Sequence, residues 1–102
     1  MTTIVYDYDN WLMSAEGHAG AGEMGEDVIC AAVSTLMQTL AINARLINAL
    51  DLQIQEGDGD MCVCCYPDPQ DAQRCRDAFD TIANGMRWLQ ADFPEFVTFI
   101  LC

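Results

Sequence analysis

A histidine and a cysteine lie twelve residues apart in a glycine-rich stretch of this chain, at His18 and Cys30. An imidazole that reaches a thiol can take its proton, and the resulting ion pair is the nucleophile of cysteine peptidases. A cysteine among alanines is, however, more often a small buried residue, and a histidine in a glycine loop is more often an exposed side chain without a chemical role. Because spacing in sequence does not establish contact in space, the dyad is a hypothesis.

The neighbouring segments would have to bring these two residues together. Four glycines in the range 17–25 indicate an irregular loop that carries His18. Asp27 is a suitable N-cap, and the apolar spacing after it predicts one helix from Asp27 to about Leu50. Cys30 would then lie in the first helical turn, where the helix dipole favours a thiolate and unpaired backbone N–H groups could bind an oxyanion. The apolar positions of this helix are Val28, Ile29, Val33, Leu36, Met37, Leu40, Ile47 and Leu50.

Two polar residues share the helical face of Cys30. Ser34 follows it by four residues and could donate a hydrogen bond to the thiolate or to a substrate. Asp27 precedes it by three and could orient His18, but a carboxylate beside Cys30 would also oppose thiolate formation. A plain helix cap is the simpler role for Asp27.

The remaining elements predict the fold class. Alternation of apolar and polar residues predicts strands at 3–8, 11–15, 52–55, 61–66 and 96–101. Asp68-Pro69 marks the start of a second helix. The residues that share its apolar face are Ala72, Cys75, Phe79, Ile82, Ala83, Met86 and Leu89. The order β-β-α-β-β-α-β predicts one α+β domain over residues 1–102, in two layers, with two helices packed on one face of a roughly five-stranded sheet.

The charge of the chain limits its partners. Sixteen Asp and Glu residues stand against four arginines, for a net charge of −12. Such a charge repels phosphate backbones and anionic lipid surfaces, so we expect no direct nucleic-acid or membrane binding. It would attract a basic protein segment, although it could also serve solubility alone.

We expect a cytoplasmic protein that forms a homodimer. No apolar run approaches the ~20 residues that span a bilayer, and the N-terminal residues are neither basic nor a long apolar stretch. Between Val28 and Leu50 only Arg45 is charged, so this helix must be covered on more than one side. A second copy of the chain could provide part of that cover.

A second cysteine cluster follows at Cys62, Cys64 and Cys65, with Cys75 further along. Four thiolates could bind zinc or act in redox chemistry, but the cluster lacks the paired C-x-x-C spacing of structural zinc sites. On a strand, Cys62 and Cys64 share one face while Cys65 points to the other. We therefore predict no metal and no cofactor, with a metal or redox protein as an alternative.

The stretch from Gly17 to Ser34 resembles the signature of the ribosomal-processing cysteine protease family. It has the Gly-His-Ala loop, the Gly-Glu-Asp turn and the Cys-Ala-Ala-Val-Ser helix start, with His and Cys at the same spacing. A weaker likeness continues at Gly85-Met86 and at 93–97, where a helix runs into a last strand. The resemblance implies a small homodimer that uses His18 and Cys30 as its dyad.

The resemblance also implies a substrate. The family removes a short N-terminal extension from large-subunit ribosomal protein number twenty-seven, after an aromatic pair, during ribosome maturation. That protein is basic, which agrees with the acidity of this chain. The loop residues Gly17, Ala19, Gly20 and Gly25 are expected to contact the substrate, with the loop acting as a lid that brings His18 toward Cys30.

Ala21 and Met24 depart from the aromatic or polar residues that many relatives have in this loop, which bears on substrate fit more than on chemistry. The alternative function is a catalytically silent, acidic dimeric module that binds a basic ribosomal partner.

Overall fold

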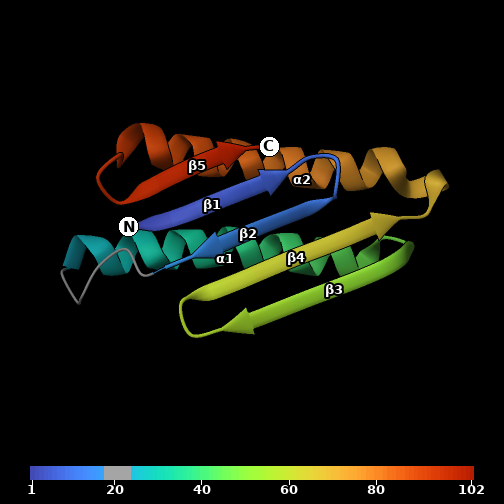
Figure 1. The fold of residues 1–102 in the computed structure, drawn as a ribbon, viewed down its shortest axis with the longest axis horizontal. Coiled ribbons are helices and arrows are strands. Elements are labelled where there is room, and N and C mark those ends of the chain that lie inside the picture. Colours follow the sequence, from blue (N-terminus) through green and yellow to red (C-terminus); the bar gives the residue numbers. More distant parts are fainter. Residues whose placement is uncertain (18–23) are drawn as a thin grey trace.

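The computed structural model describes residues 1–17 and 24–102, and for residues 24–27 it describes the backbone alone. The observed order of elements is the predicted β-β-α-β-β-α-β, in an α+β arrangement. Figure 1 shows both long helices on one face of the sheet. The elements are β1 (Thr2–Asp7), β2 (Leu12–Glu16), α1 (Met24–Leu46), β3 (Ala49–Gly57), β4 (Asp60–Pro67), a 3-10 turn (Pro69–Asp71), α2 (Ala72–Asp92) and β5 (Val97–Leu101).

The sheet has the strand order β3-β4-β2-β1-β5. Neighbouring strands run antiparallel except β1 and β5, which pair in parallel. The sheet therefore brings the β3–β4 hairpin beside β2, although α1 separates the two in sequence (Figure 1). This pairing decides which residues face the N-terminal half of α1.

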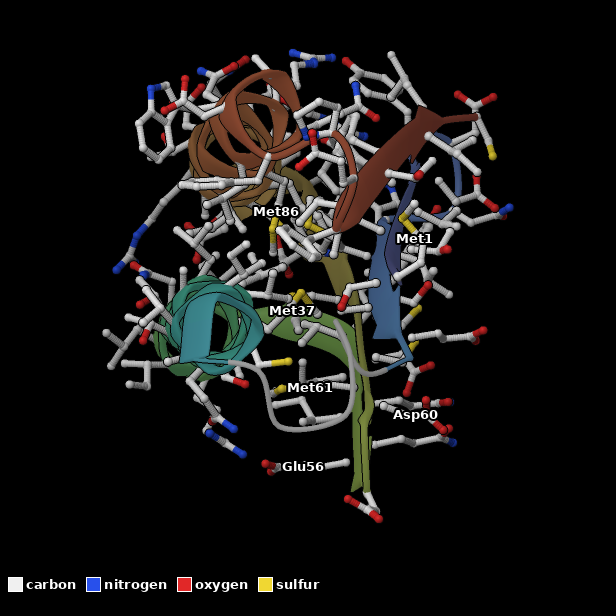
Figure 2. The ribbon with its side chains drawn as sticks, turned by 90° about the vertical axis from the view of Figure 1, so that its left-hand side faces the viewer. Met1, Met37, Glu56, Asp60, Met61 and Met86 are labelled. Carbon is white, nitrogen blue, oxygen red and sulfur yellow. The ribbon has the colours of Figure 1, made fainter. Side chains whose placement is uncertain are left out.

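Period-two alternation determines which strand residues enter the core. Ile4 and Tyr6 of β1, Met13 of β2 and Val63 of β4 are all buried, and their register pairs bring them to the helix side of the sheet. Met37 of α1, Met61 of β4 and Met86 of α2 lie between the two layers (Figure 2). The core is thus one layer of side chains between the sheet and two helices.

The helix α1 differs from its predicted bounds at both ends. It begins at Met24, so Asp27 lies inside the helix and the prediction that Asp27 is its N-cap is wrong. Glu26 and Asp27 are residue types that favour a first helical turn, which is why the helix can begin before Asp27. It ends at Leu46, because the chain then turns into β3, and this turn is held by a hydrogen bond from the Asn48 amide to the Asp71 carboxylate at 2.9 Å.

The surface of α1 is covered by the sheet and by α2. Gly85 of α2 allows a close approach, since a Cβ at this position would lie 3.0 Å from a methyl group of Leu36. Predicted buried positions Val28 and Leu50 are exposed, because Val28 lies on the outer face of α1 and Leu50 is in β3. The predicted apolar face of α2 is confirmed, with buried residues Cys75, Phe79, Ile82, Ala83, Met86 and Leu89.

By length and composition alone, the segment Val28–Leu46 could cross a membrane, which corrects the expectation that no apolar stretch approaches that length. One such helix is a weak indication, because the core helix of a soluble protein passes the same criterion. Here Val33, Met37 and Leu40 are buried within the core shared with the sheet.

An arginine of α2 packs against the end of the sheet where β1 turns into β2. The Arg76 guanidinium lies 3.5 Å from the ring centre of Tyr8 and 3.7 Å from that of Trp11. It donates hydrogen bonds to the Tyr6 hydroxyl at 2.7 Å and to the Tyr8 carbonyl at 2.9 Å. The Tyr6 hydroxyl in turn donates to Asp80 at 2.9 Å. This cluster fixes α2 against the β1–β2 turn, and it explains why Tyr8, predicted within the first strand, instead follows it.

Candidate active site

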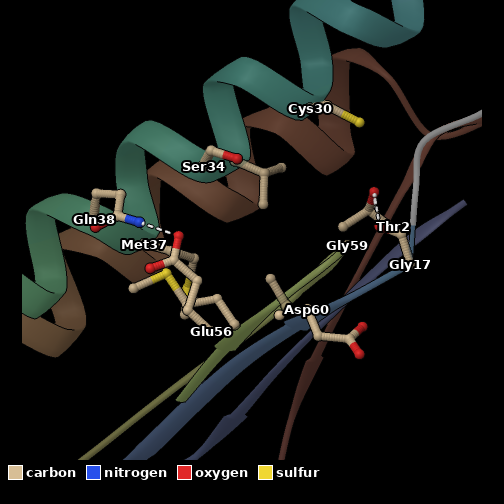
Figure 3. Close-up of a pocket in the computed structure, with 13 residues that line it drawn as sticks. Thr2, Gly17, Cys30, Ser34, Met37, Gln38, Glu56, Gly59 and Asp60 are labelled. Atoms are coloured by element: carbon tan, nitrogen blue, oxygen red, sulfur yellow. Dashed lines mark hydrogen bonds between the residues drawn. The ribbon is translucent and has the colours of Figure 1, made fainter. Parts of the chain in front are cut away.

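A cleft opens between residues 30–38 of α1 and the end of the sheet formed by β2 and the β3–β4 turn (Figure 3). As bounded by the described residues, its volume is about 210 Å³. Small-molecule sites usually measure ~300–1,000 Å³, so this cleft suits one or two side chains of a peptide better than a cofactor. The lining residues are Thr2, Ala15, Gly17, Cys30, Val33, Ser34, Met37, Gln38, Glu56, Gly57, Gly59, Asp60 and Met61.

Cys30 and Ser34 occupy successive turns of α1 along one wall of the cleft (Figure 3). The Cys30 side chain is half-buried. The structure thus brings together two of the predicted site residues, a thiol and a hydroxyl on one helical face, as their four-residue spacing requires.

The prediction that Cys30 lies in the first helical turn is wrong. Because α1 begins at Met24, Cys30 is its seventh residue. The effect of a helix dipole falls off within the first turn, and the unpaired N–H groups belong to the first four residues. The helix end therefore gives less support to a thiolate or an oxyanion at Cys30 than the sequence suggested.

Gly17 forms the wall opposite Cys30 and is the residue directly before His18. Its carbonyl accepts a hydrogen bond from the Thr2 hydroxyl at 3.1 Å (Figure 3), and its amide donates to the Gly59 carbonyl at 2.9 Å. Its φ angle is +92°, and a Cβ there would lie 2.7 Å from the Met1 carbonyl oxygen. The site therefore requires glycine at this position.

His18 lies outside the described residues, as do Ala19 and Gly20. The contact of His18 with Cys30 therefore stays a prediction. Gly25 was expected in the loop, but its backbone belongs to the first turn of α1. Asp27 has its backbone in the same turn, and its proposed part in the site stays untested.

The sequence did not predict the cleft residues that belong to the β3–β4 hairpin. Met61 is a buried floor residue of the cleft, and Glu56 reaches across it to α1, where its carboxylate accepts a hydrogen bond from Gln38 Nε2 at 2.8 Å (Figure 3). No local signal could have identified these residues, because their place depends on the pairing of β4 with β2.

The second cysteine cluster divides between the two faces of β4, as predicted. Cys62 and Cys64 are half-buried, while Cys65 is buried in the core beside Cys75, whose thiol lies 3.6 Å from the Cys65 carbonyl oxygen. Burial raises the pKa of the Cys62, Cys64 and Cys65 thiols, and raises that of Cys75 to about 12. The raised pKa values disfavour these four thiols as nucleophiles, since the thiolate is the nucleophilic form. Within the part of the chain that the structure describes, no three His, Cys, Asp or Glu residues are grouped to hold a metal ion.

Known proteins are similar to this chain over nearly all of its length. The model of a family described as cysteine protease Prp matches residues 1–98. A crystal structure of SMU.848 from Streptococcus mutans has a TM-score of 0.73 at 31% identity, over 98% of this chain and 90% of that chain. No curated protein matches the sequence.

Two further structures share the fold at lower identity. They are crystal structures of an essential ribosomal processing protease Prp from S. aureus, one in complex with a covalently linked product peptide and one with a substrate peptide. Their TM-scores are 0.81 and 0.80, at 16% identity over 100% of both chains.

Proposed function

Because this chain belongs to the cysteine protease family Prp, we propose that Cys30 is the nucleophile of a peptidase and that His18 is its general base and then its general acid. One observation carries the proposal: the Cys30 side chain lines a cleft of side-chain size whose opposite wall is Gly17, the residue bonded to His18. Of the six cysteines, Cys30 alone lines this cleft.

The proposed reaction is a two-step acyl transfer. His18 takes the thiol proton, and the Cys30 sulfur attacks the scissile carbonyl carbon to form a tetrahedral oxyanion. The C–N bond then breaks, the amine leaves with the proton from His18, and a thioester remains on Cys30. A water molecule gives its proton to His18 and attacks the thioester, which releases the acid and returns the thiolate. Ser34 lies one helical turn from Cys30 on the same wall of the cleft, and its proposed role is to hydrogen-bond the sulfur or the substrate.

The substrate that we propose is the N-terminal extension of large-subunit ribosomal protein number twenty-seven, cut during ribosome maturation. The family assignment supports a protease, and the S. aureus relatives with this fold are ribosomal processing proteases crystallised with peptides. The net charge of −12 favours the approach of a basic protein. We propose a cytoplasmic location as well, because this substrate is a component of the ribosome.

The test uses a synthetic peptide that spans this extension from the same organism, together with a scrambled peptide of equal composition. Mass spectrometry of the reaction should show a single cut in the first peptide and none in the second. Absence of a cut, with binding of the first peptide seen by fluorescence anisotropy, would favour the silent docking module instead. If the peptide is neither cut nor bound, the proposal that this extension is the substrate is refuted.

We also propose that the protein acts as a homodimer. The exposed apolar residues of α1 support this, since Val28, Ile42 and Leu46 remain uncovered on its outer face. Sedimentation equilibrium should give twice the chain mass of 11.3 kDa. A mass of one chain at the concentrations used for cleavage would refute the dimer without affecting the peptidase proposal.

A further inference from the structure

Glu56 and Asp60 are the two carboxylates among the described residues that line the cleft, and they point in opposite directions. Figure 2 shows Glu56 on the helix side of the sheet and Asp60 on the other side. The same difference is seen at close range, where Glu56 extends toward Gln38 and Asp60 turns away from α1 (Figure 3). Among the described side chains, Glu56 therefore provides the negative charge on the helix side of the cleft.

Gln38 holds this carboxylate over the cleft. Its side-chain amide donates to one carboxylate oxygen of Glu56 at 2.8 Å, in a bridge from α1 to β3. The second carboxylate oxygen keeps its capacity to accept a hydrogen bond. None of the four arginines lines the cleft, so a cation from a bound peptide would meet no competing guanidinium there.

The floor between Cys30 and Glu56 is apolar. Val33, Met37 and Met61 are buried side chains that line it. A bound peptide would therefore place apolar groups over the middle of the cleft, with the thiol at one end and a carboxylate at the other.

The length of the cleft follows from the positions of its residues in α1. Cys30 and Gln38 are eight residues apart in α1, which corresponds to about 12 Å along the axis at ~1.5 Å per residue. An extended peptide covers this distance in about three to four residues, at ~3.3 Å each.

From this geometry, and resting on the proposed peptidase function, we infer that Glu56 is a specificity-determining residue that binds a basic side chain three or four residues from the scissile bond. The guanidinium or ammonium group donates a charge-assisted hydrogen bond to Glu56, and Gln38 is a positioning residue that fixes the carboxylate. Glu56 itself is exposed. A preference of about two- to fivefold is expected, because ion pairs near solvent are weak.

The experiment measures kcat/KM for peptides in which each position within five residues of the cut, on either side, is in turn Lys, Gln or Glu. The wild-type protein should prefer Lys to Gln about two- to fivefold at one position three or four residues away. Glu56→Gln should remove this preference, and Glu56→Lys should convert it into a preference for Glu. Gln38→Met should weaken the preference for Lys over Gln, and the change should appear in KM and not in kcat.

The matched control is Asp51→Asn, which removes the same charge from the same strand at an exposed position outside the cleft. It should keep the preference for Lys. No preference in the wild-type protein, or an equal preference in Glu56→Gln, would overturn the role of Glu56.

If no peptide is cut, the peptidase proposal fails but the inference is still tested. Fluorescence anisotropy would then compare binding of the Lys and Gln peptides to Cys30→Ala and to the double variant Cys30→Ala/Glu56→Gln. Tighter binding of the Lys peptide by the first protein alone would support Glu56 as its receptor. Equal binding by both would overturn it.

Discussion

The amide of Gly17 donates a hydrogen bond to the carbonyl oxygen of Gly59 at 2.9 Å, which joins the end of β2 to the β3–β4 turn on the sheet side of the cleft. Gly17 holds this position with a φ of +92° and lies against the Met1 carbonyl. The residue that leads into the predicted catalytic loop is therefore fixed by backbone contacts on two sides.

Gly17→Ala should lower both stability and activity. Its Cβ would lie 2.7 Å from the Met1 carbonyl oxygen, so backbone must shift, and the left-handed conformation costs an L residue a further ~1–2 kcal/mol. Thermal unfolding and peptide cleavage measure the two effects. Gly57→Ala is the matched control, because a Cβ there meets nothing within 4 Å. Equal melting temperatures for the two variants would contradict this account of Gly17.

Arg76→Lys should destabilise the protein by about 1–3 kcal/mol. A lysine cannot stack its head group between two aromatic rings and donate to two oxygens at once, as the guanidinium does with Tyr8, Trp11 and the Tyr6 hydroxyl. Urea denaturation measures the free energy of unfolding. Arg74→Lys is the control, since Arg74 makes one long hydrogen bond, of 3.3 Å, to a backbone carbonyl. Similar losses in both variants would show that the ring contacts contribute nothing.

The protein should lose stability as the pH rises from about 9 to about 12. Burial, the largest cause, raises the pKa of Tyr6 from 10.0 to about 12, and that of Cys75 from 9.0 to about 12. Folding thus favours the neutral forms, so their contribution is complete below the unfolded pKa values and is lost as the pH passes the folded ones. Melting temperatures across this range measure the effect. The Tyr6→Phe variant should have a lower melting temperature than the wild type at neutral pH, and its melting temperature should fall less steeply as the pH rises. If its melting temperature falls as steeply as that of the wild type, Tyr6 is excluded as a cause.

A chelator should leave peptide cleavage unchanged. Cys62 and Cys64 lie on the face of β4 opposite that of Cys65, which packs beside Cys75 of α2, so the four thiols do not converge on one point. Cleavage assays with and without EDTA, together with elemental analysis of the purified protein, provide the measurement. Stoichiometric zinc, with activity lost on its removal, would restore the metal alternative.

Local pattern was sufficient for most of the fold. Period-two alternation identified the inward residues of β1, such as Ile4 and Tyr6, because a half-covered sheet buries every second side chain. Helical spacing identified the buried face of α2 for the same reason, since that helix has one covered side.

The prediction was less accurate where local signals compete. Asp27 satisfied the rule for an N-cap, yet the helix begins at Met24, and this moves Cys30 from the first turn to the seventh position. A cap residue is also acceptable within a first turn, so the sequence alone does not distinguish the two.

The candidate site was predicted in part. Cys30 and Ser34 share a wall of the cleft because they are one turn apart on one helix. The opposite side, with Glu56 and Met61, arises from long-range strand pairing that no local pattern encodes. The likeness to a family signature supplied the catalytic interpretation, which spacing alone could not.

The central claim is that Cys30 is the nucleophile, and the most direct test compares two cysteine variants in the same cleavage assay. Cys30→Ala should reduce kcat by at least about a thousandfold, with a melting temperature near that of the wild type, because removing a nucleophile removes the acyl transfer itself. Cys62→Ser should cleave at the wild-type rate, since Cys62 lies on β4 outside this cleft. Cleavage by a correctly folded Cys30→Ala protein at a rate near that of the wild type would contradict the account.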